Sequence, residues 1–205
     1  MRLVTSLILA SSSPRRRLML AAAGFTFDVL PPGTDETGID GETAADMVLR
    51  LATEKALAVE SVGAVALGAD TTVVRDGRVL GKPRDADDAV AALVSLAGRT
   101  HSVLSGWALV RDRTVLERGV EESWVTMRPI DEAEARSYVA TGEPLDKAGA
   151  YALQGRGRMF VTAVTGPRSN VLGLPLAAVV AALHRAGIDP SATQRRSDDA
   201  GEVFP

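Results

Sequence analysis

Apolar and polar positions alternate along the chain in a way that predicts short buried strands separated by amphipathic helices. Apolar runs bounded by turn residues indicate strands, and apolar residues repeating every three or four positions indicate helices. The expected strands cover Ser6–Ala10, Phe25–Leu30, Ala64–Val74, Thr100–Arg111, Val120–Met127 and Met159–Val164. The expected helices cover Pro14–Ala23, Thr43–Ser61, Asp85–Ala97, Asp131–Thr141 and Pro175–Ala186.

The order of these elements predicts an α/β fold with a mixed, partly antiparallel sheet flanked by helices. The dipeptide Asp76-Gly77 predicts a hairpin directly after the third strand. We expect residues 1–188 to form a single domain. The remainder, 189–205, is polar and aperiodic, and we expect it to be a disordered tail.

Composition excludes several classes of function. With 205 residues, 46% of them hydrophobic, the chain is large enough for a substantial core. The net charge of −3 and the aromatic content of 4% argue against nucleic-acid binding. The absence of cysteine excludes disulfides, thiolate zinc sites and cysteine nucleophiles. The two histidines, His101 and His184, lie far apart, so neither a two-histidine metal centre nor a Ser-His hydrolase is expected.

No apolar run approaches the ~20 residues that a membrane-spanning helix needs. Pro14 and the arginines that follow it interrupt the short apolar run at the N-terminus, which therefore does not resemble a signal peptide. We expect a cytoplasmic protein without a membrane partner.

The segment from Ser11 to Arg17 has the features of a phosphate-binding turn. Ser13 suits the N-cap of a helix and Pro14 its first position, and the free N–H groups there attract anions. Arg15 and Arg16 add guanidinium groups that match phosphate oxygens. A well-capped surface helix with solvated arginines explains the same residues equally well.

Two charged residues occupy positions where apolar residues are expected. Asp70 lies inside an apolar strand, where it either holds a cation or accepts a proton, or else marks a bulge or strand end and binds backbone amides. Lys55 shares an apolar helical stripe with Val48 and Leu51. It either extends its ammonium group to solvent, the commoner outcome, or projects into a cleft to meet an anion.

Other candidates are weaker when taken singly. Lys82 and the pair Asp35-Glu36 are in predicted loops, where solvated charges are common. Gln154 follows a glycine-rich segment and carries an amide that is able to read the edge of a base. Together, dispersed acidic and basic groups without a nucleophile or a histidine base suit metal-assisted attack by water on a phosphate ester or anhydride.

Six motifs occur together, in order, and carry a family resemblance. They are Ser11-x-Ser-Pro-Arg-Arg16, Glu54-Lys-Ala56, Gly68-Ala-Asp-Thr71, Gly81-Lys-Pro83, Asp146-Lys-Ala-Gly-Ala-Tyr151 continuing to Gln154-Gly155, and Gly173-Leu-Pro-Leu176. In these motifs the chain resembles the Maf family. The resemblance implies a nucleoside triphosphate pyrophosphatase, a hydrolase of phosphoric anhydrides that releases a nucleoside monophosphate and pyrophosphate. It also implies a two-lobed α/β fold around a cleft, similar to that of the inosine triphosphatases, and a homodimer.

The resemblance also implies a role for each matching residue. Asp70 would be the general base. The groups around the triphosphate would be Ser13, Arg15, Arg16, Lys55 and Lys82. A divalent cation, Mg²⁺ or Mn²⁺, would be held by Asp70 together with Asp35 or Glu36, between which the alignment does not choose. Base selection would involve Arg15, Thr71 and Gln154.

The motif ending at Gln154 is similar to the family branch that prefers dTTP and UTP rather than the branch that prefers 7-methylguanosine triphosphate. The sequence therefore predicts a dTTP/UTP pyrophosphatase. The alternative is a non-catalytic nucleotide-binding regulator of cell division and septum formation. Such a regulator would keep the basic residues but would not need Asp70.

Overall fold

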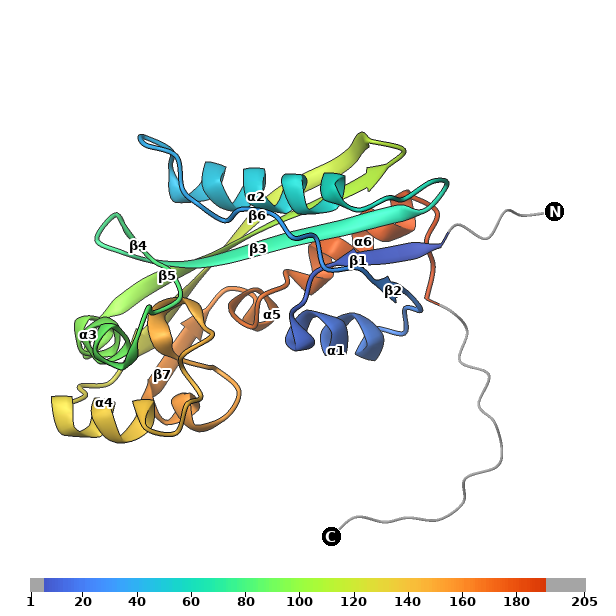
Figure 1. Ribbon diagram of the computed structural model, residues 1–205. Coiled ribbons are helices and arrows are strands. Elements are labelled where there is room, and N and C mark those ends of the chain that lie inside the picture. The colour runs from blue at the N-terminus through green and yellow to red at the C-terminus, as the bar shows by residue number, and fades with distance from the viewer. Residues whose placement is uncertain (1–5, 191–205) are drawn as a thin grey trace, which may run out of the picture.

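The computed structural model describes residues 6–190, which form one seven-stranded mixed sheet flanked by helices (Figure 1). The strand order is β2-β1-β3-β5-β6-β7, and β4 pairs with β3. β1 is parallel to β2 and β3, and the remaining pairs are antiparallel. The strands are β1 (Leu7–Ala10), β2 (Asp28–Val29), β3 (Val65–Arg75), β4 (Arg78–Leu80), β5 (Thr100–Arg111), β6 (Thr114–Met127) and β7 (Val161–Thr165). The predicted fold class is confirmed.

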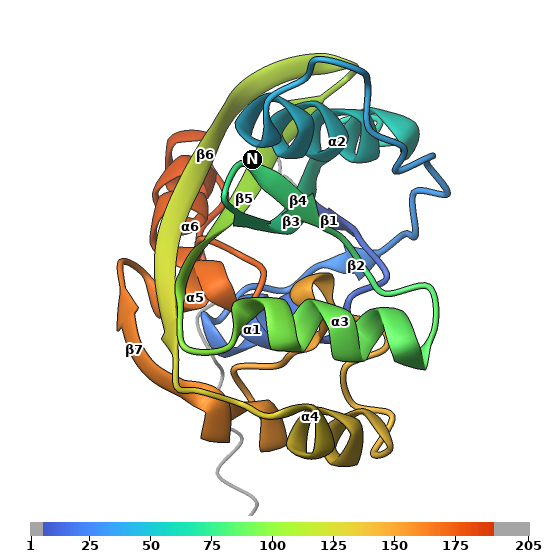
Figure 2. The ribbon, with the colours of Figure 1, turned by 90° about the vertical axis from the view of Figure 1, so that its left-hand side faces the viewer.

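Helices cover both faces of this sheet. They are α1 (Pro14–Ala22), α2 (Ala44–Ala58), α3 (Ala86–Leu96), α4 (Glu132–Val139), α5 (Arg168–Val171) and α6 (Leu176–Arg185), with 3₁₀ turns η1 (Ala148–Ala150) and η2 (Arg156–Phe160). Figure 2 shows α2 on one side of the long strands and α1 and α3 on the other. No helix among residues 6–190 is long and apolar enough to span a bilayer.

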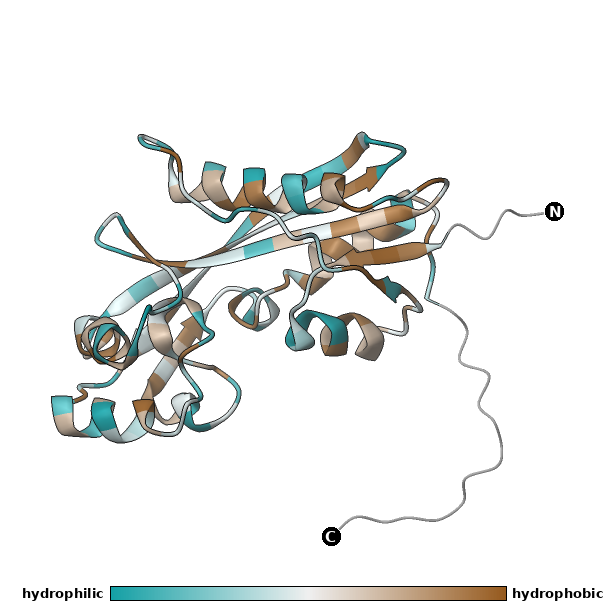
Figure 3. Cartoon of the chain, in the orientation of Figure 1, coloured by the Kyte–Doolittle hydropathy of each residue, from teal (hydrophilic) through white to brown (hydrophobic). Residues whose placement is uncertain are grey.

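Two large hydrophobic clusters lie along the long strands β3 and β5, and a third, small one joins α2 to the same strands through Ala56, Ala66, Ala108 and Val110. The first core cluster packs β1, α1 and α6 against the strands and includes Leu9, Leu20, Leu67, Ala69, Leu109 and Leu183. The second core cluster packs α3 and α4 against them and includes Val73, Leu93, Val103, Tyr138, Tyr151 and Phe160. Figure 3 shows β1 and the adjoining part of β3 as hydrophobic, with a hydrophilic band part-way along β3. The two clusters therefore meet β3 on either side of Asp70.

Helix α2 packs unusually close to the sheet because two glycines lie beneath it. A Cβ atom on Gly68 would lie 2.1 Å from the carbonyl oxygen of Ala52, and one on Gly106 would lie 2.2 Å from that of Val48. Any side chain at either position would push the helix away from the strands. This close approach allows a side chain on α2 to reach the middle of β3.

Several predicted boundaries are wrong, each for a local reason. The second strand covers only Asp28–Val29, because the N–H of Phe25 instead binds the carbonyl of Leu20 at the end of α1. β6 begins at Thr114 rather than at residue 120, because Asp112 and Arg113 form its turn with positive φ angles and without glycine. Helix α5 was not predicted, because four residues are too few for a helical period. The predicted tail, 189–205, falls outside the described residues from position 191 onward.

His101 on β5 is buried beside the second core cluster, and its Nε2 lies 2.8 Å from the hydroxyl oxygen of Tyr151. Burial lowers the pKa of His101 to about 4. An unfolded histidine has a pKa of about 6.5, so the unfolded chain binds this proton more tightly than the folded one. The stability that comes from a neutral His101 is therefore present above about pH 6.5 and is lost as the pH falls toward 4.

When the pH falls from about 7 to about 5, we expect the free energy of unfolding to decrease by about 1–2 kcal/mol on account of His101 alone. Urea denaturation at the two pH values should show that the free energy of unfolding falls less in His101→Gln than in the wild type. The matched control is His184→Gln, which removes the other histidine, exposed on α6, by the same substitution. An equal fall in all three proteins would contradict the prediction.

Candidate active site

A cleft of about 1090 Å³ opens where the two core clusters meet β3. Its walls come from the β1–α1 connection, the loop before α2, α2 itself, the middle of β3 and the segment 143–154. All but one of the site residues predicted from the sequence line this cleft. They are Ser13, Arg15, Arg16, Glu36, Lys55, Asp70, Thr71, Lys82 and Gln154.

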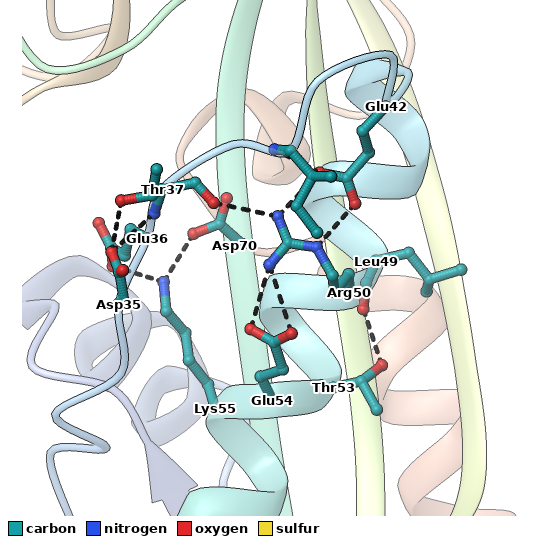
Figure 4. Close-up of polar contacts among 11 residues, drawn as sticks. Asp35, Glu36, Thr37, Glu42, Leu49, Arg50, Thr53, Glu54, Lys55 and Asp70 are labelled. Atoms are coloured by element: carbon teal, nitrogen blue, oxygen red, sulfur yellow. Dashed lines mark hydrogen bonds and ion pairs between the residues drawn. The ribbon is translucent and has the colours of Figure 1, made fainter.

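Lys55 lies at the centre of the polar contacts in the cleft. Its Nζ atom is 2.6 Å from Oε1 of Glu36 and 2.6 Å from Oδ1 of Asp70 (Figure 4). Only 4% of the residue is exposed. Of the two interpretations of this lysine, the one that directs it into a cleft is confirmed. The ammonium group joins three separate elements: α2, β3 and the loop before α2.

Asp70 lies in the middle of β3, directly opposite Gly106 on β5, and the pairing runs through it without a bulge. The interpretation of Asp70 as a bulge or strand-end residue is therefore wrong. Its side chain is almost buried, and Lys55 donates to Oδ1. The other oxygen, Oδ2, has no hydrogen-bond partner among residues 6–190. One carboxylate oxygen is thus available to a water molecule or a cation in the cleft.

The structure separates Asp35 from Glu36. The carboxylate of Asp35 accepts hydrogen bonds from the N–H and hydroxyl of Thr37, at 2.9 and 2.6 Å, and it does not line the cleft. Glu36 faces the cleft and also binds Lys82 at 3.1 Å. Burial opposes ionisation of Glu36, but the hydrogen bonds and charges of Lys55 and Lys82 outweigh it and lower its pKa to about 2. Glu36 is therefore the acidic residue that faces Asp70 across Lys55.

The two neighbouring arginines have different surroundings. Arg16 donates to the carbonyl of Gly173 at 2.8 Å, to Ser11 Oγ at 3.2 Å and to Thr71 Oγ1 at 3.2 Å. It joins the β1–α1 connection, β3 and the loop before α6. Arg15 lines the cleft and has no hydrogen-bond or ion-pair partner within the described part of the chain. Arg15 is thus the more available cation.

Ser13 occupies the N-cap position of α1, but its side chain makes no capping bond. The helix therefore begins where the sequence places it, with Ser13 as the predicted N-cap residue, but the Ser13 hydroxyl does not cap it. No acidic residue lies in the first turn. Ser13 and the first residues of the helix line the cleft, and the first turn itself contributes no carboxylate that would compete with an anion there.

Gln154 is exposed and lines the cleft, and its amide has no partner among the described residues. Its loop is held by Glu143, a residue that the sequence analysis missed. The carboxylate of Glu143 accepts from the N–H groups of Arg156 and Gly157, both at 3.0 Å, and from the hydroxyl of Tyr138 at 2.8 Å. No motif or spacing in the sequence marks this internal contact.

A sequence model of the family described as "Maf-like protein" matches residues 6–186. The chain belongs to the Maf-like protein family. A dTTP/UTP pyrophosphatase of Anaeromyxobacter dehalogenans (strain 2CP-C) is 52% identical over 186 residues, which cover 88% of this chain and 94% of the relative. One of Myxococcus xanthus (strain DK1622) is 50% identical over 188 residues, with 90% and 94% covered. One of Pelotomaculum thermopropionicum is 46% identical over 184 residues, with 88% and 96% covered.

In this Maf-like protein, the sequence analysis also missed the residues that hold the loop carrying Glu36. Arg50 on α2 forms ion pairs with Glu42 and Glu54. The spacing of Arg50 and Glu54, four residues apart on a helix, is a signal that could have found the second pair. Nothing in the sequence indicates that Arg50 also binds the loop before α2.

Proposed function

We propose that this Maf-like protein hydrolyses dTTP and UTP to the nucleoside monophosphate and pyrophosphate. The observation that carries the proposal is the nearly buried Asp70, with one oxygen free of protein partners, in a cleft lined by basic groups. A carboxylate in that position is costly unless it has a chemical task. The names of the similar relatives support the same activity and the same substrates.

Asp70 would accept a proton from the attacking water. The water oxygen forms a bond to the α-phosphorus while the bond from that phosphorus to the α–β bridging oxygen breaks, and pyrophosphate leaves. Arg15, Lys82 and the N-terminus of α1 would neutralise the charge that gathers on the phosphate oxygens. Lys55 holds Asp70 and Glu36 in place and carries a further positive charge at the cleft centre.

A divalent cation such as Mg²⁺ or Mn²⁺ prefers oxygen ligands. The cleft offers Oδ2 of Asp70 beside Glu36, whose two oxygens also accept from Lys55 and Lys82. Among residues 6–190 no group of three or more acidic or histidine side chains is gathered for a metal. Glu36 and Asp70 would thus hold the ion together with substrate oxygens and water, as is usual for Mg²⁺. When bound, the ion would supply positive charge to the phosphate groups.

Pyrophosphate release from a panel of nucleoside triphosphates with Mg²⁺ or Mn²⁺ tests the proposal directly. We expect dTTP and UTP to have a higher kcat/KM than purine triphosphates, because the amide of Gln154 offers both a donor and an acceptor. These complement the O4 and N3–H groups of thymine and uracil. Gln154→Ala should narrow that preference by about tenfold.

Inorganic tripolyphosphate has no base, so its hydrolysis by Gln154→Ala should match that of the wild type. If 7-methylguanosine triphosphate were the best substrate, the predicted preference for dTTP and UTP would be wrong, and the proposed pyrophosphatase activity would be retained. Nucleotide binding without pyrophosphate release from any member of the panel would favour the alternative, a regulator of cell division. A homodimer and a cytoplasmic location stay predictions.

A further inference from the structure

Arg50 is the most fully engaged cation next to the cleft, although it does not line it. Its Nε and Nη2 atoms donate to the two carboxylate oxygens of Glu42, at 2.7 and 2.8 Å. Nη1 donates to both oxygens of Glu54, at 3.3 and 3.2 Å. Nη2 also donates to the carbonyl oxygen of Thr37, at 3.2 Å. These contacts use all five N–H groups of the guanidinium (Figure 4).

The loop that receives these bonds has no regular structure of its own. Neither a helix nor a strand occurs between Val29 and Ala44. Within this stretch the backbone bonds are one from Leu30 to β1, one from Glu42 to Ile39, and the one by which the Thr43 carbonyl accepts the N–H of Met47 at the start of α2. The shape of the segment that carries Glu36 therefore depends on side-chain contacts.

Arg50 holds this segment at two points. The carbonyl of Thr37 comes one residue after Glu36, and Glu42 ends the loop just before α2 begins. Oε2 of Glu42 also accepts a hydrogen bond from the N–H of Ile39, at 3.4 Å. The part of the loop between Thr37 and Glu42 is therefore bound to Glu42 as well. Arg50 and Lys55 lie on the same helix. Helix α2 therefore binds the backbone of the loop through Arg50 and the Glu36 carboxylate through Lys55.

We propose that Arg50 is a positioning residue that keeps Glu36 directed at Lys55 and at the cation site of the cleft. Its planar guanidinium reaches two carboxylates and a carbonyl at once. A lysine, as a single point charge on a flexible stem, does not. The part of this proposal that concerns the cation rests on the proposed function. The part that concerns the order of the loop does not.

The test compares Arg50→Lys with wild type by three measurements. Hydrogen exchange of the segment 34–42 should become faster, while that of β3 stays unchanged. The affinity for Mn²⁺ alone, measured by electron paramagnetic resonance without nucleotide, should fall by about tenfold to a hundredfold, the range typical of groups that orient a metal ligand. The kcat for dTTP should fall by a similar factor.

Arg136→Lys is the matched control, because Arg136 forms ion pairs with Glu132 and Asp87 away from the cleft. It should match the wild type in all three measurements. Glu42→Gln is the second variant, in case Arg50→Lys does not fold. It removes the charge that pairs with Arg50 and leaves the bonds from Arg50 to Thr37 and Glu54. Loop exchange, Mn²⁺ affinity and kcat should therefore change in the same directions as in Arg50→Lys, but by smaller factors.

Unchanged loop exchange and unchanged Mn²⁺ affinity in a folded Arg50→Lys protein would overturn the proposal, even with a lowered melting temperature. Arg50 would then only stabilise α2. Faster loop exchange in a protein whose wild type releases no pyrophosphate would support the role of Arg50 in ordering the loop. The proposed function alone would fail in that case.

Discussion

Replacing Asp70 with asparagine is expected to leave the fold intact and to slow pyrophosphate release by about a hundredfold or more. The amide has nearly the same shape, and its oxygen still accepts the bond that Lys55 donates to Oδ1. It has no basic oxygen to take a proton from water at the position of Oδ2. The measurements are kcat with dTTP, circular dichroism for the fold and calorimetry for nucleotide binding, which should remain close to the wild type.

The matched control for this variant is Asp112→Asn. The carboxylate of Asp112 accepts the N–H of Gly63, at 2.9 Å, in a turn far from the cleft. Its φ angle of 49° is one that asparagine also adopts readily. Turnover by Asp112→Asn should match the wild type. A folded Asp70→Asn protein with near-normal turnover would exclude Asp70 as the base.

Replacing Lys55 with methionine should impair hydrolysis of triphosphates with every base, by about a hundredfold, since the charge at the cleft centre is lost. The side chain is similar in length, so the packing of α2 is kept. Asp70 would then lose the one cation that the described residues give it, while Glu36 keeps its ion pair with Lys82. Removing one member of a buried charged pair costs about 3 kcal/mol. Both turnover and thermal stability should therefore fall. The panel of nucleotides and a melting curve measure the two effects.

The double variant Lys55→Met/Asp70→Asn separates the two effects. Removing the nearly buried carboxylate relieves the unpaired charge, so the melting temperature should recover toward the wild type. Activity should not recover, because both groups are missing. If Lys55→Met lost only stability and kept its turnover, Lys55 would be a structural counter-ion rather than part of the substrate site.

The pattern of apolar positions is local, and it identified most of the elements and the two charged residues that interrupt them. The other site residues were assigned their roles by the family resemblance. Asp70 and Lys55 stand out as charges inside apolar patterns, and the structure places both in the cleft. The Arg15 region predicts the start of α1 correctly. Boundaries were missed where local signals are weak, as at Asp112-Arg113, a turn without glycine.

The contacts within the site were decided by tertiary structure. Whether Lys55 extends to solvent or into the cleft depends on how close α2 lies to β3, which Gly68 and Gly106 control from positions remote in sequence. Arg15 and Arg16 are chemically identical, yet only the folded chain brings Gly173 and Thr71 to Arg16.

The choice between Asp35 and Glu36 was likewise outside the reach of the sequence, because a loop without periodic structure has no preferred face. A turn at Thr37 directs Asp35 away from the cleft, and Lys55 draws Glu36 into it. Side-chain identity and local periodicity are written along the chain and determine which groups are present and on which elements. Their distances depend on packing between segments far apart in sequence, and so only the folded protein decides which carboxylate meets which cation.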